Sequence, residues 1–269
     1  MTRYDVNLSI LFTELPLLER PAAARAAGFG AVELWWPFAV AVPPDRDVDA
    51  LVAAVEGAGV RLVGLNFFAG DMAGGDRGLV SWPARAAEFR DNVEATVAIG
   101  DRLGCRAFNA LYGNRVDEAT PKEQDEVGTE SLAYAAKAAD RLGATVLVEP
   151  VSGPKPYPLR TADDAVAVVE RVRATGAGNV GFLCDLFHLA NNGDDVDAAI
   201  ARHADRVAHV QIADAPGRGE PGSGGLPLDR WLGELEKSGY AGYVGLEYKP
   251  TTTTEQSLAW LPPERRSTH

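Results

Sequence analysis

Residues 145–186, TVLVEPVSGPKPYPLRTADDAVAVVERVRATGAGNVGFLCDL, contain two short apolar runs separated by an alanine- and valine-rich segment. The runs, at residues 145–151 and 180–186, are rich in β-branched and apolar residues and predict buried strands. The segment between them has helical spacing and ends near Gly176, a residue type that often closes a helix in the left-handed conformation. The stretch therefore predicts a strand–helix–strand unit whose two strands run parallel.

The same alternation continues in both directions along the chain. Six further runs are predicted as strands, at residues 4–10, 31–35, 61–67, 106–111, 207–213 and 243–248. Helical segments lie between the runs, and several end at a glycine: Gly28, Gly59, Gly104, Gly143 and Gly239. Eight such units without a break in composition favour an α/β fold, the (β/α)8 TIM barrel, over a doubly wound open sheet. No G-x-G-x-x-G follows the first run, which weakens a dinucleotide-binding open sheet.

The length and composition of the chain fit one domain. A barrel of this kind commonly uses about 250 residues, and 46% of the 269 residues are hydrophobic, which is enough for one core. We therefore expect a single TIM-barrel domain over residues 1–269, with a short C-terminal tail at about 262–269. The formal net charge of −12 disfavours nucleic-acid and membrane partners, because their phosphate groups are also negative.

The N-terminus and the cysteines bear on the cellular compartment. Residues 1–9 carry charge at Arg3 and Asp5 and lack the apolar run of a signal peptide. No stretch of about 18 uninterrupted apolar residues predicts a membrane-spanning helix. Cys105 and Cys184 each lie in an apolar stretch and are predicted to be buried free thiols. These features predict a soluble, cytoplasmic protein.

Single polar residues stand near the C-terminal ends of the last four predicted strands, namely Glu149, Asp185, Gln211 and Glu247. Successive members are 36, 26 and 36 residues apart, each close to one strand–helix unit, so neighbouring strands should aim these side chains at one another. Three carboxylates buried together repel each other and lose their hydration, which a divalent cation would offset. The alternative is that each acid is separately exposed or paired with a local base.

Two long, glycine-rich connections follow the third and seventh predicted strands, at residues 69–83 and 216–227. Long loops in a compact domain commonly act as lids or binding loops. Both follow strand C-termini, the face where barrel enzymes build their active sites. We therefore predict that they border the site, with disordered surface loops as the alternative.

Two motifs are specific enough to indicate a family, QIADAPGR at residues 211–218 and EYKP at residues 247–250. Further supporting stretches lie at residues 7–14, 30–33, 69–71, 77–78, 148–150, 185–188 and 220–222. With these motifs the chain resembles, from end to end, the hydroxypyruvate isomerase family within the xylose isomerase-like TIM barrels.

The resemblance implies a metal site and an acid–base pair. Glu149, Asp185, Gln211 and Glu247 are the implied metal ligands, and Glu149 and Glu247 are also the implied catalytic residues. Three carboxylates and one amide suit a hard cation such as Mg²⁺ or Mn²⁺ better than zinc.

The implied reaction is metal-dependent aldose–ketose isomerisation of a short sugar acid. Hydroxypyruvate and tartronate semialdehyde, interconverted through an enediolate in glyoxylate metabolism, are the first expectation, and 2-oxo-tetronate isomerisation is an alternative. A ketose 3-epimerase is disfavoured because that branch typically has histidine where this chain has Gln211. An abasic-site endonuclease with a zinc cluster is disfavoured by only four histidines and strong acidity. A non-catalytic sugar-binding barrel is also left open.

Six polar residues are expected to contact the substrate, one from the resemblance and five from their side-chain chemistry and position. His188 resembles the family's substrate-contacting histidine, and a structural histidine is the alternative. Arg218 and Lys249 are predicted to bind the substrate carboxylate, with solvated loop positions as the alternative. Three polar residues at strand ends are also predicted to contact substrate unless salt bridges or turns explain them: Glu33, Asn66 and Asn109.

Two other features are interpreted as structural. His209 should face the same side as Gln211, because strand side chains alternate, and we predict that it packs beneath the metal. The aromatic cluster at residues 35–38 is expected to wall the pocket, cap the barrel or join an interface. The expected partner is a small sugar acid, and a homo-oligomer is left open.

Overall fold

Eight parallel strands form a closed barrel in the computed structural model, which describes residues 2–153 and 155–266. The strands are β1 (Arg3–Asn7), β2 (Ala31–Leu34), β3 (Arg61–Asn66), β4 (Ala107–Asn109), β5 (Thr145–Val148), β6 (Val180–Asp185), β7 (Val207–Ile212) and β8 (Tyr243–Leu246). They pair in chain order, and β1 also pairs with β8, where Val6 lies opposite Leu246. The predicted TIM barrel is confirmed, and an open doubly wound sheet is excluded because the first and last strands are joined.

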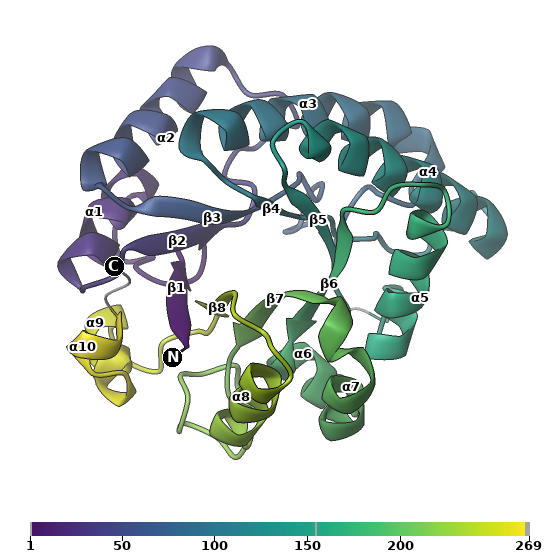
Figure 1. The fold of residues 1–269 in the computed structure, drawn as a ribbon. Coiled ribbons are helices and arrows are strands. Elements are labelled where there is room, and N and C mark those ends of the chain that lie inside the picture. The colour runs from purple at the N-terminus through teal and green to yellow at the C-terminus, as the bar shows by residue number, and fades with distance from the viewer. Residues whose placement is uncertain (1, 154, 267–269) are drawn as a thin grey trace.

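Helices surround the barrel on its outer face (Figure 1). They are α1 (Arg20–Ala26), α2 (Asp45–Ala58), α3 (Ala86–Leu103), α4 (Pro121–Asp140), α5 (Ala162–Arg173), α6 (Leu186–Asn192), α7 (Val196–His203), α8 (Leu228–Lys237), α9 (Thr254–Ser257) and α10 (Pro263–Arg266), with short 3-10 turns η1 (Leu17–Glu19), η2 (Pro83–Arg85), η3 (Ala204–Arg206) and η4 (Leu258–Trp260). All six glycines predicted to close helices have positive φ angles, as left-handed caps require. Gly59 and Gly104 are themselves the C-caps of α2 and α3.

The predicted site residues Glu149, Asp185 and Glu247 lie at slightly different positions relative to the ends of their strands. Every predicted run overlaps a strand, but β5 ends at Val148 and β8 ends at Leu246. Glu149 and Glu247 therefore follow their strands, whereas Asp185 ends β6. The pairing of β5 with β6 ends at Val148, and Pro150, two residues on, has no N–H group with which to extend it.

The core fills both the barrel interior and the layer between strands and helices. All six residues of β6 are buried. Phe108 of β4 lies against Gly100 of α3, where an added Cβ would come within 2.4 Å of the Phe108 ring. Glycine at this position permits the close approach of helix and strand. Cys105 and Cys184 are buried and free, as predicted.

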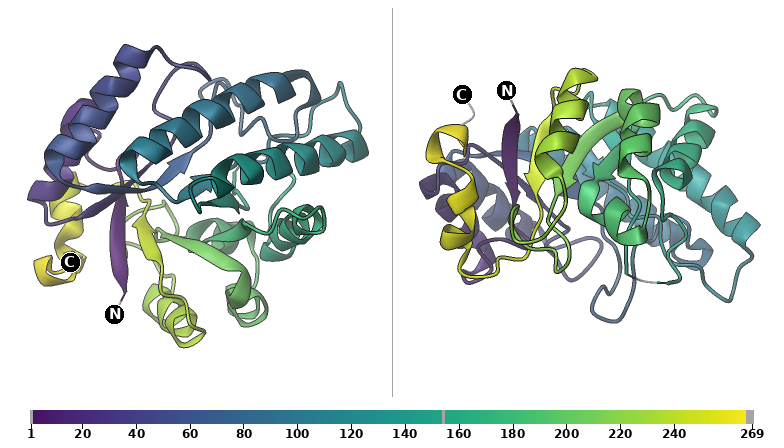
Figure 2. Two further views of the ribbon diagram at one scale, coloured as in Figure 1. Left: turned by 45° about the horizontal axis from the view of Figure 1, so that its top comes forward. Right: turned by 90° about the horizontal axis from the view of Figure 1, so that it is seen from below.

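The two long connections are folded rather than extended. In the connection after β3, Arg85 Nη1 lies 2.9 Å from Asp76 Oδ2. The connection after β7 is organised around Asp214, whose carboxylate accepts backbone N–H bonds from Gly222, Gly224 and Leu226, each at 2.9 Å. In the right-hand view of Figure 2, the connections that follow the strands extend from the barrel end opposite the N-terminus.

The region predicted as a C-terminal tail includes α10. Arg266 of this helix donates hydrogen bonds to the carbonyl groups of Leu258, Leu261 and Ala27. Residues 267–269 lie outside the described residues. Among the helices that the structure describes, none is long and apolar enough to cross a membrane.

Candidate active site

Three of the predicted metal ligands meet at the C-terminal end of the barrel. Glu149, Asp185 and Glu247 are buried, and together with His188 they offer ligand atoms that all lie within 4.8 Å of one another. We call Glu149, Asp185 and Glu247 the acid cluster. Neighbouring parallel strands that end at one face explain this convergence.

Asp185 and Glu149 each have one oxygen held by a protein donor. Asp185 Oδ1 caps α6 by accepting the backbone N–H of His188 at 3.0 Å. Glu149 Oε2 accepts Asn109 Nδ2 at 2.7 Å. The other oxygens face the imidazole, because His188 Nε2 lies 3.6 Å from Asp185 Oδ2 and 3.8 Å from Glu149 Oε1. Asp185 Oδ2 and Glu149 Oε1 are thus the oxygens available to bind a ligand or to accept a proton.

Glu247 repeats this arrangement. Its Oε1 accepts Trp35 Nε1 at 2.5 Å and Asn7 Nδ2 at 3.0 Å. Its Oε2 is paired with the guanidinium of Arg218, whose Nη2 also lies 3.9 Å from Asp185 Oδ2. Asn7 on β1 and Trp35 after β2 therefore hold Oε1 of Glu247, and Oε2 is left on the side of Arg218.

Gln211, the fourth predicted ligand, lies beside the acid cluster on β7. It is in register with Asp185 on β6, and its Nε2 donates to Glu33 Oε1 at 2.7 Å and to Glu247 Oε1 at 3.3 Å. Its Oε1 is buried and has no hydrogen-bond partner among the described residues. An unpartnered buried oxygen normally costs stability, so this atom suits a cation ligand.

The donor set fits Mg²⁺ or Mn²⁺. Three carboxylate oxygens and the amide oxygen of Gln211 form an all-oxygen set, which hard cations prefer. His188 contributes differently, because the backbone N–H of Ser152 donates to its Nδ1 at 3.1 Å. Nδ1 is then an acceptor and the neutral ring carries its hydrogen on Nε2, so the imidazole serves as a donor rather than a ligand.

Burial controls the protonation of the site. Burial, with added repulsion from Glu247 and Asp185, raises the pKa of Glu149 well above its usual range. Burial also raises the pKa of Glu247 to about 7, although the positive charge of Arg218 opposes the shift. Burial lowers the pKa of His188 to about 4, so this imidazole is neutral at physiological pH. Glu247 can therefore exchange a proton near neutrality, and Glu149 holds its proton to a higher pH than an exposed glutamate does.

A cleft of about 630 Å³ lies over the acid cluster. Its lining includes Glu149, Glu247, His188, Arg218, Lys249, Asn66, Arg77, Met72, Ala73, Trp35, Leu111, Val151, Ser152 and Gly153. Four predicted substrate contacts are therefore present in one cleft: His188 and Arg218 near the acids, Asn66 half-buried, and Lys249 exposed.

Two predicted substrate contacts are placed elsewhere. Asn109 is buried and donates a hydrogen bond to Glu149, and it is not among the described residues that line the cleft. Glu33 is also absent from that lining and is 3% exposed. Both oxygens of Glu33 accept hydrogen bonds from neighbouring barrel residues. These two side chains are therefore hydrogen-bonded to Glu149 and Gln211, two of the predicted ligands.

Three contributors to the site were not predicted as such. Asn7 and the indole nitrogen of Trp35 hold Glu247, and the backbone of Ser152 sets the orientation of His188. A signal existed for Asn7, which ends the first strand as Asp185 ends the sixth. Ser152 meets His188 Nδ1 through its backbone N–H at 3.1 Å and through its hydroxyl oxygen at 2.7 Å, a contact between residues 36 positions apart that no sequence pattern identifies.

A second buried group lies beneath the acid cluster and consists of Asp5, Glu33 and His209. His209 Nε2 lies 2.8 Å from Glu33 Oε2, and its place below a metal stays a prediction. Burial alone would raise the pKa of Glu33, but the hydrogen bonds from His209, Gln211 and Asn7, together with the charge of His209, lower it. Burial raises the pKa of Asp5 well above its usual range, and Glu33 adds to the shift.

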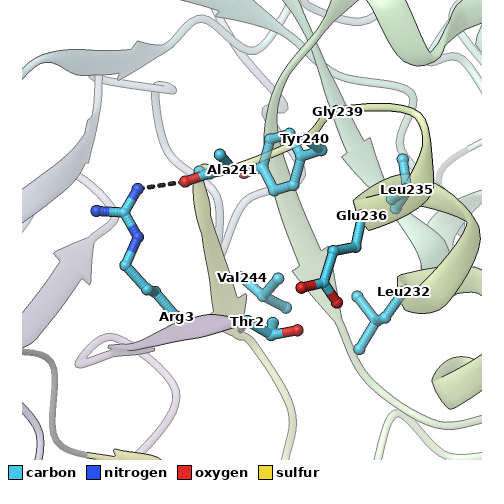
Figure 3. A pocket seen from close by; sticks show the side chains of 10 residues that line it. Thr2, Arg3, Leu232, Leu235, Glu236, Gly239, Tyr240, Ala241 and Val244 are labelled. Atoms are coloured by element: carbon cyan, nitrogen blue, oxygen red, sulfur yellow. Dashed lines mark hydrogen bonds between the residues drawn. The ribbon is translucent and has the colours of Figure 1, made fainter.

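A separate cavity of about 400 Å³ opens at the N-terminal end of β1 and β8, beside α8 (Figure 3). Leu232, Leu235 and Val244 form its apolar wall, and the Arg3 guanidinium donates to the Ala241 carbonyl at its edge. The residues that line it include none of the predicted site residues. The chemistry is therefore concentrated at the opposite end of the barrel.

Known proteins similar to this chain identify its family. The family model described as xylose isomerase-like TIM barrel matches residues 21–264. A Streptomyces coelicolor protein whose name assigns it as a hydroxypyruvate isomerase is 55% identical, over 98% of this chain and 97% of its own length. The Escherichia coli hydroxypyruvate isomerase is 33% identical over 98% and 100%. The Cupriavidus necator 2-oxo-tetronate isomerase is 33% identical over 98% of each chain.

One solved structure carries a different title. The crystal structure of an AP endonuclease, family 2, from Brucella melitensis superposes with a TM-score of 0.88 and 36% identity, covering 98% of this chain and 99% of that one. The barrel architecture is therefore shared by proteins named for different reactions, and the side chains at the site must decide between them.

Proposed function

This chain belongs to the xylose isomerase-like TIM barrel family, among relatives named as sugar-acid isomerases, and we propose that it interconverts hydroxypyruvate and tartronate semialdehyde with the help of a divalent cation. The observation that carries the proposal is the acid cluster at the base of the cleft, in which each carboxylate keeps one oxygen free of backbone and amide donors. Beside it lies the unpartnered oxygen of Gln211.

Glu149, Asp185, Gln211 and Glu247 would hold Mg²⁺ or Mn²⁺. A bound cation would stabilise the negative charge that develops on the substrate oxygens when a C–H proton leaves. Isomerisation removes a proton from C3 of hydroxypyruvate and delivers one to C2, through an enediolate, while the hydroxyl proton on O3 is lost and one is gained on O2. We assign these transfers to Glu149 Oε1 and Glu247 Oε2, because the other oxygen of each carboxylate accepts from Asn109 or from Asn7 and Trp35. Glu247 Oε2 is paired with Arg218 in the structure, so the substrate carboxylate would share this guanidinium.

Two further residues would orient the substrate. His188 presents a neutral Nε2–H group between Glu149 and Asp185, where it can donate to a substrate oxygen. Arg218 has its guanidinium in the cleft, 5.5 Å from the centre of the Phe187 ring, where it can bind the substrate carboxylate.

The rival functions are less well supported by the side chains. An endonuclease with a zinc cluster needs several histidine ligands, whereas the acid cluster has one neighbouring histidine and that ring acts as a donor. A ketose 3-epimerase remains disfavoured by Gln211. The 2-oxo-tetronate reaction uses a longer substrate and stays the second candidate. The Cupriavidus necator relative that carries this name is 33% identical to the chain, as is the Escherichia coli hydroxypyruvate isomerase.

A substrate panel separates these candidates. Purified protein with Mg²⁺ or Mn²⁺ should isomerise hydroxypyruvate with a kcat/KM well above its values for 2-oxo-tetronates, neutral ketoses and abasic-site DNA. The measurement is a coupled assay for each aldehyde product and gel analysis for DNA cleavage. Higher kcat/KM for a 2-oxo-tetronate would transfer the assignment to that substrate, and cleavage of DNA without isomerisation would refute it.

Replacing Arg218 by lysine should reduce kcat/KM for hydroxypyruvate by about 10–100-fold, because a planar fork that binds a carboxylate through two N–H groups is lost. Arg77→Lys is the matched control. It changes another cleft arginine, whose Nη1 donates to the carbonyl groups of Met72 and Asp76 rather than to the acids. Equal effects of the two substitutions would remove Arg218 from substrate binding.

A further inference from the structure

Glu33 of β2 is held on every side inside the barrel. It is 3% exposed. Its Oε1 accepts Asn7 Nδ2 at 3.0 Å and Gln211 Nε2 at 2.7 Å, and its Oε2 accepts His209 Nε2 at 2.8 Å. Three donors on two oxygens leave this carboxylate one orientation.

The barrel also makes room for Glu33. An added Cβ at Gly245 of β8 would lie 2.7 Å from Glu33 Oε1, and one at Gly64 of β3 would lie 3.2 Å from Oε2. Gly245 is in register with Gln211 on β7. Glycine at both positions lets the carboxylate reach across β1 and β8 to the Gln211 side chain.

The hydrogen bond that Gln211 donates to Glu33 determines where the nitrogen and the oxygen of its amide lie. The oxygen and nitrogen ends of an amide have nearly the same shape, so packing alone does not distinguish them. With the amide reversed, Gln211 Oε1 would lie where Nε2 now lies, 2.7 Å from an oxygen of Glu33. Two acceptor oxygens at that distance repel each other, so Glu33 selects the orientation in which Gln211 Oε1 points away from it.

We propose that Glu33, oriented by Asn7 and His209, is a positioning residue that turns the Gln211 amide so that its oxygen is presented to the cation. The inference rests on the metal site of the proposed function. It explains why Gln211 Oε1 is buried without a partner while Nε2 has two acceptors. In this proposal Glu33 acts on the cation site through its hydrogen bond with Gln211, whereas the sequence predicted a direct contact of Glu33 with substrate.

Mn²⁺ binding tests this assignment without substrate. Glu33→Met removes the acceptor at similar volume, and Mn²⁺ affinity, measured by the electron paramagnetic resonance signal of free Mn²⁺, should fall by about 10–100-fold. Electron spin echo measurements in deuterated water should show an added water ligand on Mn²⁺ in place of the amide oxygen. Asp5→Asn is the control, because Asp5 is equally buried in the barrel but makes no hydrogen bond to Gln211.

A paired exchange guards against simple misfolding. In Glu33→Gln with Gln211→Glu, the new amide at 33 donates to a carboxylate at 211, which presents oxygen in either orientation, and the net charge is unchanged. This double variant should recover most of the lost Mn²⁺ affinity and the parent number of water ligands. Glu33→Gln alone is not used, because it keeps an oxygen that can still accept from Gln211.

The outcomes separate the two proposals. Unchanged Mn²⁺ affinity and water count in a folded Glu33→Met protein would overturn the positioning role while leaving the metal site intact. Loss of affinity that the paired exchange does not restore would overturn it as well. No Mn²⁺ binding by the parent protein would refute the metal site itself, and the positioning role with it.

Discussion

Replacement of Glu247 by glutamine is expected to lower kcat for hydroxypyruvate by about 10²–10⁴-fold, the range that general acid–base assistance provides. An amide cannot accept and return a proton as a carboxylate does. Because Asn7 and Trp35 donate to the Oε1 position, the new amide should keep its oxygen there and turn its nitrogen toward Arg218. Metal affinity should therefore weaken as well, and the rate is to be compared at saturating Mn²⁺.

Exchange of the C3 proton with deuterated water shows which half of the reaction fails in Glu247→Gln. Glu220→Gln is the matched control, since the Glu220 carboxylate accepts the backbone N–H of Thr251 at 3.0 Å, outside the acid cluster. That control should isomerise at the parent rate. A Glu247→Gln protein that binds Mn²⁺ and also turns over at the parent rate would end the two-carboxylate mechanism.

Removal of divalent cations should reduce turnover to background, and added Mg²⁺ or Mn²⁺ should restore it. The acid cluster holds three buried carboxylates, and among the cationic side chains of residues 2–153 and 155–266 the guanidinium of Arg218 is the one paired with them. A bound cation would supply further positive charge. Mn²⁺ at 100 times its Kd should also stabilise the folded protein by about 2.7 kcal/mol, measured as a rise in the free energy of unfolding.

The pH dependence of cation binding follows from the carboxylates. Glu149 and Glu247 have raised pKa values, to about 7 for Glu247, so protons compete with the cation and are released when it binds. Mn²⁺ affinity should therefore increase as pH rises through neutrality. Full activity of a protein freed of metal, or an affinity that falls over this range, would contradict the metal site.

The sequence alone was sufficient for the barrel and for the identity of its main polar residues. Strand and helix periodicities are local properties, and the intervals between Glu149, Asp185, Gln211 and Glu247 match one strand–helix unit each. Once parallel strands close into a barrel, residues at equivalent strand ends must meet at one face. The clustering of the acids, the positive φ of the cap glycines and the burial of both cysteines follow from such local patterns.

Only the tertiary structure decided what each polar atom does. Asn7 and Glu247 are 240 positions apart and come within 3.0 Å because β1 and β8 close the barrel. The same closure brings Glu33 to Gln211 and takes it out of the cleft, against the predicted substrate contact. Hydrogen bonds depend on distances and directions resolved to tenths of an ångström. Sequence spacing locates a side chain only to a strand and a face, so the choice of free oxygen and the direction of the Gln211 amide depend on the folded barrel.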